Sequence, residues 1–210
     1  MRITKLGHSC VLVETEDRVA IYDPGVWSEA FEIDSIDRVD RIIITHSHPD
    51  HFDVTKIKQL VDKFPDAHLV CNADIRDLAE QAGLEVTIRE ETECSVAFDS
   101  PHEKLPVPGA DAPTENGYHF QNLFTSPGDS HSFNETKKVL AMPFIAPWGK
   151  TGDAVDKVLE LKPEYVLPIH DWHYTEEARA WLDGLLANAL DGSGIKLIPS
   201  EPGIQHEIPE

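Results

Sequence analysis

The sequence predicts an α+β protein in which two β-sheets lie face to face with helices outside them. Short strand-like runs separated by Gly, Asp and Glu turns fill the first part of the chain. Segments with apolar residues at helical spacing alternate with later strands, and two of these segments lie near the end. This order, β-rich first and then mixed with late helices, suits two packed sheets with helices on their outer faces.

Strands are expected where a short apolar run is bounded by turn residues. In the first part of the chain these runs are 2–6, 10–14, 18–23 and 41–45. Further along they are 68–71, 85–89, 94–98, 118–125, 138–141, 165–169 and 197–198. The tail after Pro199 is expected to be loose.

Helices are predicted from apolar spacing together with start and stop signals. They are expected over 54–64, 73–82, 151–161 and 175–189. Pro65 ends the first, while Asn72 suits the N-cap of the second and Gly83 its end. Thr175, followed by two acidic residues, suits the start of the last helix. Trp181 lies on the apolar stripe of that helix and is expected in the core.

The segment 101–116 is the least regular part of the chain, with four prolines and Gly109. It is too long for a simple hairpin loop. We therefore expect it to border a functional site.

Length and cysteine content indicate one domain in a reducing compartment. A chain of 210 residues fits a single domain, 1–210, with a sizeable core. No apolar run reaches transmembrane length, and the first residues resemble a strand rather than a secretory signal. The three cysteines show no CxxC spacing, so neither a disulfide framework nor a zinc finger is implied. A cytoplasmic location is the default.

The net charge argues against a polyanionic partner. Lys and Arg number 18 against 38 Asp and Glu, a balance of −20. Nucleic-acid binding depends on basic groups that neutralise phosphates, and no basic cluster occurs, so no nucleic-acid partner is expected. No membrane partner is expected either, and homo-oligomers are compatible with this composition. The acidity is best explained as maintaining solubility.

The densest set of chemically active residues follows the apolar run Ile42-Ile43-Ile44. His46, His48, Asp50 and His51 lie within six residues, and a solvated loop rarely carries so many ligand side chains. Imidazole and carboxylate are the usual ligands of zinc, manganese and iron. Residues two apart in an extended segment point to one side, so His46 and His48 suit one metal. Asp50 and His51 lie past the turn and suit a second.

The pattern His46-x-His48-x-Asp50-His51 resembles that of the metallo-β-lactamase-fold hydrolases. The flanking motifs, in their order along the chain, resemble the branch that includes the ascorbate-6-phosphate lactonases. These motifs are Leu6-Gly7-His8-Ser9-Cys10, Tyr22-Asp23-Pro24-Gly25, Pro127-Gly128-Asp129-Ser130 and Pro168-Ile169-His170-Asp171. The resemblance implies a four-layer αββα sandwich.

The resemblance also implies a ligand set for two divalent metal ions, zinc first, with manganese or iron as alternatives. It assigns His46, His48 and His102 to the first metal, Asp50, His51 and His170 to the second, and Asp129 as the bridge. Each ligand group follows an apolar strand, a common plan for sites on a rigid scaffold. His119, in the next strand, competes with His102 for the third position. Gly128 would let the backbone come close to the metals.

Such a centre favours hydrolysis of a small molecule. Two divalent cations, less the charges of Asp50, Asp129 and a bridging hydroxide, leave a formal charge of about +1. Surface charges beyond about 8 Å are screened at physiological salt, so a small anionic or carbonyl substrate is attracted locally. A metal-bound hydroxide would attack an ester, lactone or phosphoester.

Catalytic roles are predicted for Asp50, Asp129 and His131. Asp50 would accept a proton if the second metal site is empty, and His131 would donate one to the leaving group. His173 is an alternative donor. His8 either orients a ligand or makes a structural hydrogen bond.

Other residues beside the predicted ligands have weaker assignments. Asp23 either supports the metal histidines or forms a turn. Trp27, Trp148 and Trp172 lie near the site loops and are pocket-wall candidates.

Two alternatives remain open: an iron-loaded redox enzyme on the same scaffold, and a metal-binding protein without catalysis. Departures from better-known relatives narrow the choice. Asp129 stands where two-zinc β-lactamases place a cysteine, which argues against antibiotic hydrolysis. The helical domain of glyoxalase relatives and the basic arm of RNA-processing relatives are not visible in the sequence.

Overall fold

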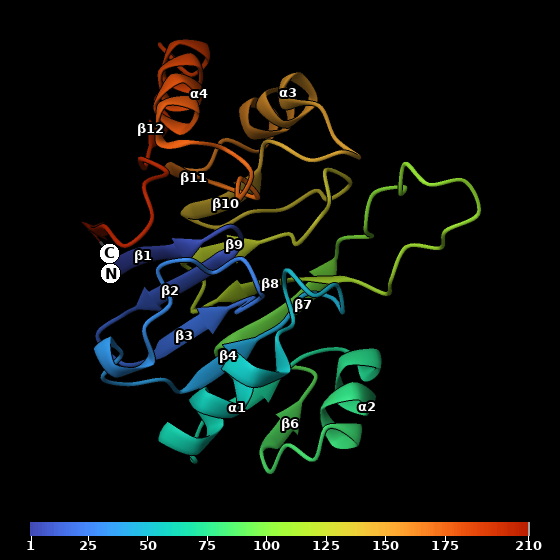
Figure 1. Cartoon of the computed structure of the whole chain (residues 1–210). Coiled ribbons are helices and arrows are strands. Elements are labelled where there is room, and N and C mark those ends of the chain that lie inside the picture. Colours follow the sequence, from blue (N-terminus) through green and yellow to red (C-terminus); the bar gives the residue numbers. More distant parts are fainter. Residues whose placement is uncertain (210) are drawn as a thin grey trace.

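The computed structural model describes residues 1–209 as four layers, two sheets between two pairs of helices (Figure 1). Helices α1 (Val54–Lys63) and α2 (Ala73–Gln81) cover the outer face of the first sheet. Helices α3 (Thr151–Leu161) and α4 (Glu176–Ala189) cover the outer face of the second. The predicted αββα arrangement is confirmed. In the described residues, no helix is long and apolar enough to span a bilayer.

The first sheet has seven strands. Their spatial order is β13 (Gln205–Glu207), β1 (Arg2–Gly7), β2 (Cys10–Glu14), β3 (Val19–Tyr22), β4 (Arg41–Ile43), β5 (His68–Val70) and β6 (Thr87–Arg89). Pairing is antiparallel from β13 to β3 and parallel from β3 to β6. The expectation of a loose tail after Pro199 is wrong, because β13 pairs with β1 and Ile208 is buried against the inner core.

The second sheet has six strands. Their spatial order is β12 (Lys196–Leu197), β11 (Tyr165–Ile169), β10 (Val139–Pro143), β9 (Phe124–Ser126), β8 (Asn116–Phe120) and β7 (Ser95–Asp99). The expected single strand over 118–125 is wrong, because it is a hairpin of β8 and β9. Gln121 and Asn122 turn the chain with φ of 47° and 56°, which asparagine adopts more readily than most residues.

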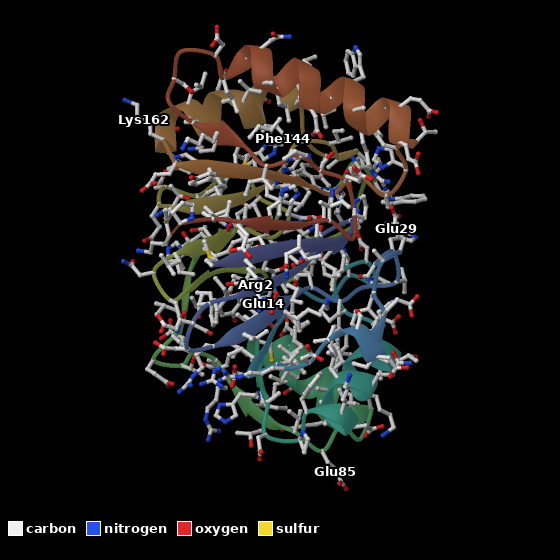
Figure 2. All side chains as sticks on the ribbon, turned by 90° about the vertical axis from the view of Figure 1, so that its left-hand side faces the viewer. Arg2, Glu14, Glu29, Glu85, Phe144 and Lys162 are labelled. Carbon is white, nitrogen blue, oxygen red and sulfur yellow. The ribbon has the colours of Figure 1, made fainter. Side chains whose placement is uncertain are left out.

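Three buried apolar clusters hold the layers together. One lies between the sheets and includes Tyr22, Tyr118 and Phe124. The others join each sheet to its helices, and Phe144 lies in the upper one in Figure 2. The prediction that Trp181 belongs to the core is wrong, since its side chain is 65% exposed.

Helix starts agree with the predicted caps. The side chain of Asn72 accepts a hydrogen bond from Ile75 N at the start of α2, and Thr175 does the same for Ala178 N at α4. A short 3₁₀ helix, Ile33–Ser35, was not expected.

Strand ends from both sheets supply the predicted ligands. His46 follows β4 of the first sheet, and His102, Asp129 and His170 follow β7, β9 and β11 of the second. The segment between β7 and β8 leaves the layers as a long loop in Figure 1. The two sheets therefore deliver side chains from distant parts of the chain to one place.

Candidate metal centre

The structure gathers all seven predicted ligands into two adjacent groups. Within each group the ligand atoms lie within 4.8 Å of one another. One group consists of His46, His48, His102 and Asp129, and the other of His8, Asp50, His51 and His170. His8 is an addition to the predicted set.

In the first group three imidazole nitrogens face one another. His48 Nδ1 lies 3.1 Å from His46 Nε2 and 3.3 Å from His102 Nε2. Asp129 Oδ2 lies 3.9 Å from His46 Nε2 and 3.7 Å from His102 Nε2. The structure thus brings His102 to the site. Its competitor His119 lies elsewhere, with Nδ1 3.0 Å from Thr125 Oγ1.

Asp129 connects the first group with the second. Its Oδ1 lies 3.1 Å from His51 Nε2, and its Oδ2 lies 3.1 Å from His170 Nε2. Asp50 Oδ2 is 3.7 Å from the same nitrogen of each histidine. A single buried carboxylate therefore faces ligand atoms of both groups, as a bridging ligand must.

Hydrogen bonds on the far side of the ring orient His102 and His170. His102 Nδ1 donates to the carbonyl of Glu103 at 2.6 Å, and His170 Nδ1 donates to that of Ile145 at 2.7 Å. A carbonyl can only accept, so these Nδ1 atoms carry protons and leave the Nε2 atoms facing the site, where they could bind a cation.

Asp23 holds His51 in the same way. Its Oδ2 lies 3.0 Å from His51 Nδ1, and its carboxylate also accepts from the backbone N–H and hydroxyl of Thr45. Buried among three donors, Asp23 lies where a carboxylate that supports the metal histidines is expected, and it also forms the turn after β3 with φ of 42°.

Glu115 is a site residue that sequence reasoning missed. Its buried Oε2 lies 2.8 Å from His46 Nδ1 and accepts from Asp129 N at 2.9 Å. It lies next to the end of the irregular segment 101–116, whose predicted position beside the site is correct. No motif surrounds it, so the only available signal was a carboxylate near the end of a proline-rich loop.

Gly128 makes room for a buried carboxyl group. Its φ is +68°, and a Cβ there would lie 2.7 Å from Glu115 Cδ. The predicted close approach of the backbone to the metals stays a prediction.

Burial and the charges of neighbouring groups shift the pKa values of the ligands, and the balance between them differs from residue to residue. At His46, burial and the neighbouring imidazoles lower the pKa well below its usual value. At His51, burial also favours the neutral ring, but the carboxylates of Asp129 and Asp23 outweigh it and raise the pKa. Burial favours neutral Asp129 as well, yet His170 and His51 hold its pKa well below normal. The carboxylates of Asp129 and Asp23 thus favour a positive charge at His51.

His131 lies outside both groups. Its Nε2 donates to the carbonyl of Pro143 at 2.8 Å, and its ring packs against Trp148 with centroids 5.4 Å apart. Trp148 in turn lies 6.0 Å from His102 and 5.5 Å from His170 between ring centroids. The predicted catalytic histidine is therefore separated from the ligands by a tryptophan.

The remaining aromatic candidates lie beside the second group. Trp27 and Trp172 stack with centroids 3.9 Å apart, and Trp27 meets His8 edge-on at 5.3 Å. His173 packs beside Trp172, with ring centroids 5.6 Å apart.

A buried ion-pair network supports the loop that carries His170. Asp171 Oδ2 accepts from Lys5 Nζ at 2.7 Å and from Arg179 Nε at 3.2 Å. Arg179 also pairs with Glu29 at 2.7 Å. This network joins β1, α4 and the loop after β3 behind the site.

The residues present fit two divalent cations. Buried imidazole and carboxylate donors converge with their lone pairs inward, the set that zinc, manganese and iron accept. His51 Nε2 and Asp129 Oδ1 are buried 3.1 Å apart without the geometry of a hydrogen bond, and neither atom makes a hydrogen bond to any other described residue. A buried polar atom without a hydrogen bond is costly, and a cation would satisfy both atoms.

An αββα sandwich with this buried ligand set at its strand ends defines a metalloprotein of the metallo-β-lactamase fold. Residues 2–170 match the family model described as the Beta-lactamase superfamily domain, and the chain belongs to this superfamily of hydrolases.

One curated protein is similar in sequence, and solved structures share the fold. Protein Rv0786c of Mycobacterium tuberculosis is 30% identical over 219 aligned positions, covering 97% of this chain and 99% of that protein. Igni18, a metallo hydrolase from the hyperthermophilic archaeon Ignicoccus hospitalis, has a similar structure, with a TM-score of 0.68, 16% identity and 99% of both chains covered. CmlA, a diiron β-hydroxylase from Streptomyces venezuelae, has a TM-score of 0.62 and 13% identity, with 94% of this chain and 52% of that chain covered.

Proposed function

We propose that this protein is a dinuclear metal-dependent hydrolase that acts on a small ester, lactone or phosphoester. The observation that carries the proposal is the position of Asp129, whose two oxygens face ligand atoms of both groups. In this proposal His46, His48 and His102 would hold one metal, and Asp50, His51 and His170 the other. Zinc is the first expectation, with manganese or iron as alternatives.

Metals bound there would lower the pKa of water towards about 7 and polarise the substrate's carbonyl or phosphoryl oxygen. The chain's own residues hold the ligands in position. Glu115 and Asp23, together with the carbonyls of Glu103 and Ile145, fix the orientation of four imidazoles. The site therefore needs little reorganisation during the reaction.

In this proposal Asp50 is a ligand of the second metal, and it would accept a proton if that site is empty. Burial favours its neutral acid, but the hydrogen bond from His8 and the charge of His51 lower its pKa to about 2. The carboxylate is therefore ionised near neutral pH, which is the form that binds a cation.

The test combines metal analysis with a substrate screen. The protein is purified without added metal, its metal content is measured, and lactones, phosphodiesters and thioesters are offered with zinc or manganese. Asp129→Ala should lose both bound metal and turnover. Glu85→Ala, at an exposed carboxylate just before β6 and at the bottom of Figure 2, should lose neither. Full activity and full metal content in Asp129→Ala would contradict the proposal.

The iron-loaded redox enzyme remains the second candidate. Histidine and carboxylate ligands accept iron, and CmlA, a diiron enzyme, has a similar fold. Bound iron with oxygen consumption and no chelator-sensitive hydrolysis would favour it. Full metal occupancy with no turnover across the screen would favour a non-catalytic metal-binding protein.

Partners and location follow from sequence and stay proposals. We propose a small-molecule substrate, anionic ones included, with no nucleic-acid or membrane partner, and a cytoplasmic location. The three cysteines are all buried and free, which suits a reducing compartment. The finer resemblance to ascorbate-6-phosphate lactonases, the single-domain organisation and the oligomeric state stay predictions.

A further inference from the structure

His8 is the one buried histidine at the site that the proposed ligand set does not use. It lies in the turn between β1 and β2, and its side chain is fully buried. Its backbone carbonyl accepts from His170 N at 3.1 Å, and its ring centroid lies 4.2 Å from that of His170. Its ring nitrogen is near enough to the second group to count among the possible ligands.

The two ring nitrogens of His8 have different partners. Nδ1 accepts a hydrogen bond from Trp172 N at 3.3 Å. Nε2 lies 3.0 Å from Asp50 Oδ2. A backbone amide can only donate, so Nδ1 supplies the lone pair and the ring proton sits on Nε2. A nitrogen that carries a proton has no lone pair for a metal, and this one donates to the Asp50 carboxylate.

Asp50 is one of the proposed ligands that solvent reaches. Its side chain is 14% exposed, against 0% for His51 beside it, and it extends from the loop after β4. Water on the open side would compete for its oxygens and allow the carboxylate to rotate. The hydrogen bond from a ring buried behind it removes that freedom.

The backbone around His8 is built to place this ring. His8 has φ of 49°, a left-handed conformation that histidine adopts at a cost. Gly7 before it has φ of +109°, and a Cβ there would lie 2.6 Å from Glu29 N. The turn is thus pressed against the loop after β3, and the edge-on contact with Trp27 closes the other side of the ring.

We propose that His8 is a positioning residue that holds Asp50 in its ligating orientation, and that it is not itself a metal ligand. The inference rests on the proposed metal centre and goes beyond it. It assigns a role to the Gly7-His8-Ser9 motif that sequence reasoning left open between orienting a ligand and a purely structural bond.

Two substitutions separate these roles. His8→Asn suits the left-handed backbone but is too short to reach Asp50, whereas His8→Gln carries an N–H long enough to replace Nε2. Binding of zinc to the metal-free proteins is measured by competition with a chromophoric chelator, together with metal stoichiometry and urea unfolding.

We expect His8→Asn to bind one of the two zincs about 10–100-fold less tightly, with the other unchanged, and His8→Gln to recover most of the loss. In an Asp50→Ala background, His8→Asn should cause no further change in zinc affinity, because the carboxylate it positions is gone.

Three results would overturn the inference. Equal loss of one zinc in both variants would make His8 a ligand. Unchanged zinc affinity in His8→Asn would remove any role at the centre. A loss shared by both zincs and matched by lower unfolding stability would make the residue purely structural. Zinc binding that follows the expectation without any turnover would contradict the proposed hydrolase activity and leave this inference standing.

Discussion

Replacing Asp171 by leucine should destabilise the protein strongly, because it leaves the Lys5 ammonium buried without its counter-charge. Lys5 is 1% exposed and Asp171 is fully buried. Burial already lowers the pKa of Lys5, and the adjacent carboxylate opposes that effect. Arg179 loses one partner in the variant but keeps Glu29.

The size of the effect has two independent limits. Removing one partner of a buried ion pair costs about 3–5 kcal/mol. The loss also has a ceiling, because Lys5 can give up its proton. From an unfolded pKa of about 10.4, deprotonation at pH 7 costs about 4.6 kcal/mol, at about 1.4 kcal/mol per pH unit. The two limits agree, and they predict a fall in melting temperature of about 6–20 °C.

The sign of the pH dependence follows from the same argument. Removing the Asp171 carboxylate lowers the pKa of Lys5 in the folded variant further than in the folded wild type. Between that lowered pKa and the unfolded value, the unfolded variant binds more protons than the folded one, so the stability of the variant rises with pH. The deficit of Asp171→Leu relative to wild type should therefore shrink towards pH 10. Urea unfolding of the metal-free proteins at pH 7 and 9.5, followed by circular dichroism, measures it.

The matched control is the double variant Lys5→Met/Asp171→Leu. Replacing a buried pair by apolar residues of similar size is often neutral or stabilising, so the second substitution should restore most of the loss. A deficit below about 1 kcal/mol, a deficit that does not change with pH, or a double variant as unstable as the single one would refute the reasoning.

Three further outcomes are expected. Gly128→Ala should destabilise the protein by about 1–3 kcal/mol in urea unfolding, because Gly128 has a φ of +68° and a Cβ there would meet the carboxyl of Glu115. The control is Gly184→Ala on α4, where a Cβ meets nothing within 4 Å, and it should stabilise the protein by about 0.5–1 kcal/mol. Zinc binding at pH 7 should release protons, because the carboxylates beside His51 outweigh burial and raise its pKa. Calorimetry in buffers of different ionisation enthalpy measures the release. Binding without proton release would contradict the raised pKa of His51. Burial raises the pKa of the Cys10 thiol to about 12, so a disulfide reagent should label it only after unfolding, and labelling of the folded protein would be evidence against this.

Features encoded by local pattern were predictable from the sequence. The run Ile42-Ile43-Ile44 before four ligand residues marked a strand end at a metal site, and Asn72 and Thr175 marked helix starts at the correct positions. These signals succeed because each depends on residues a few positions apart.

Features that depend on distant contacts were missed. Glu115 belongs to the site only because the fold brings it to His46 and Asp129. The predicted strand over 118–125 was too long because the turn inside it was overlooked. Neither Gln121 nor Asn122 is a glycine, the residue that usually marks a left-handed turn. Trp181 was assigned to the core from its place on an apolar stripe, but the covered face of α4 is formed by Leu182 and Leu186.

The pairing of β1 with β13 has a consequence for how this chain assembles. The register joins Arg2 to Glu207, so β1 acquires its outer neighbour only after all the strands that lie between them in the sequence have been synthesised. Until then β1 is an edge strand with unpaired backbone N–H and C=O groups, which can pair with strands of other chains. The interval before β13 is synthesised and pairs with β1 is therefore a period in which the chain is exposed to aggregation and to chaperone capture.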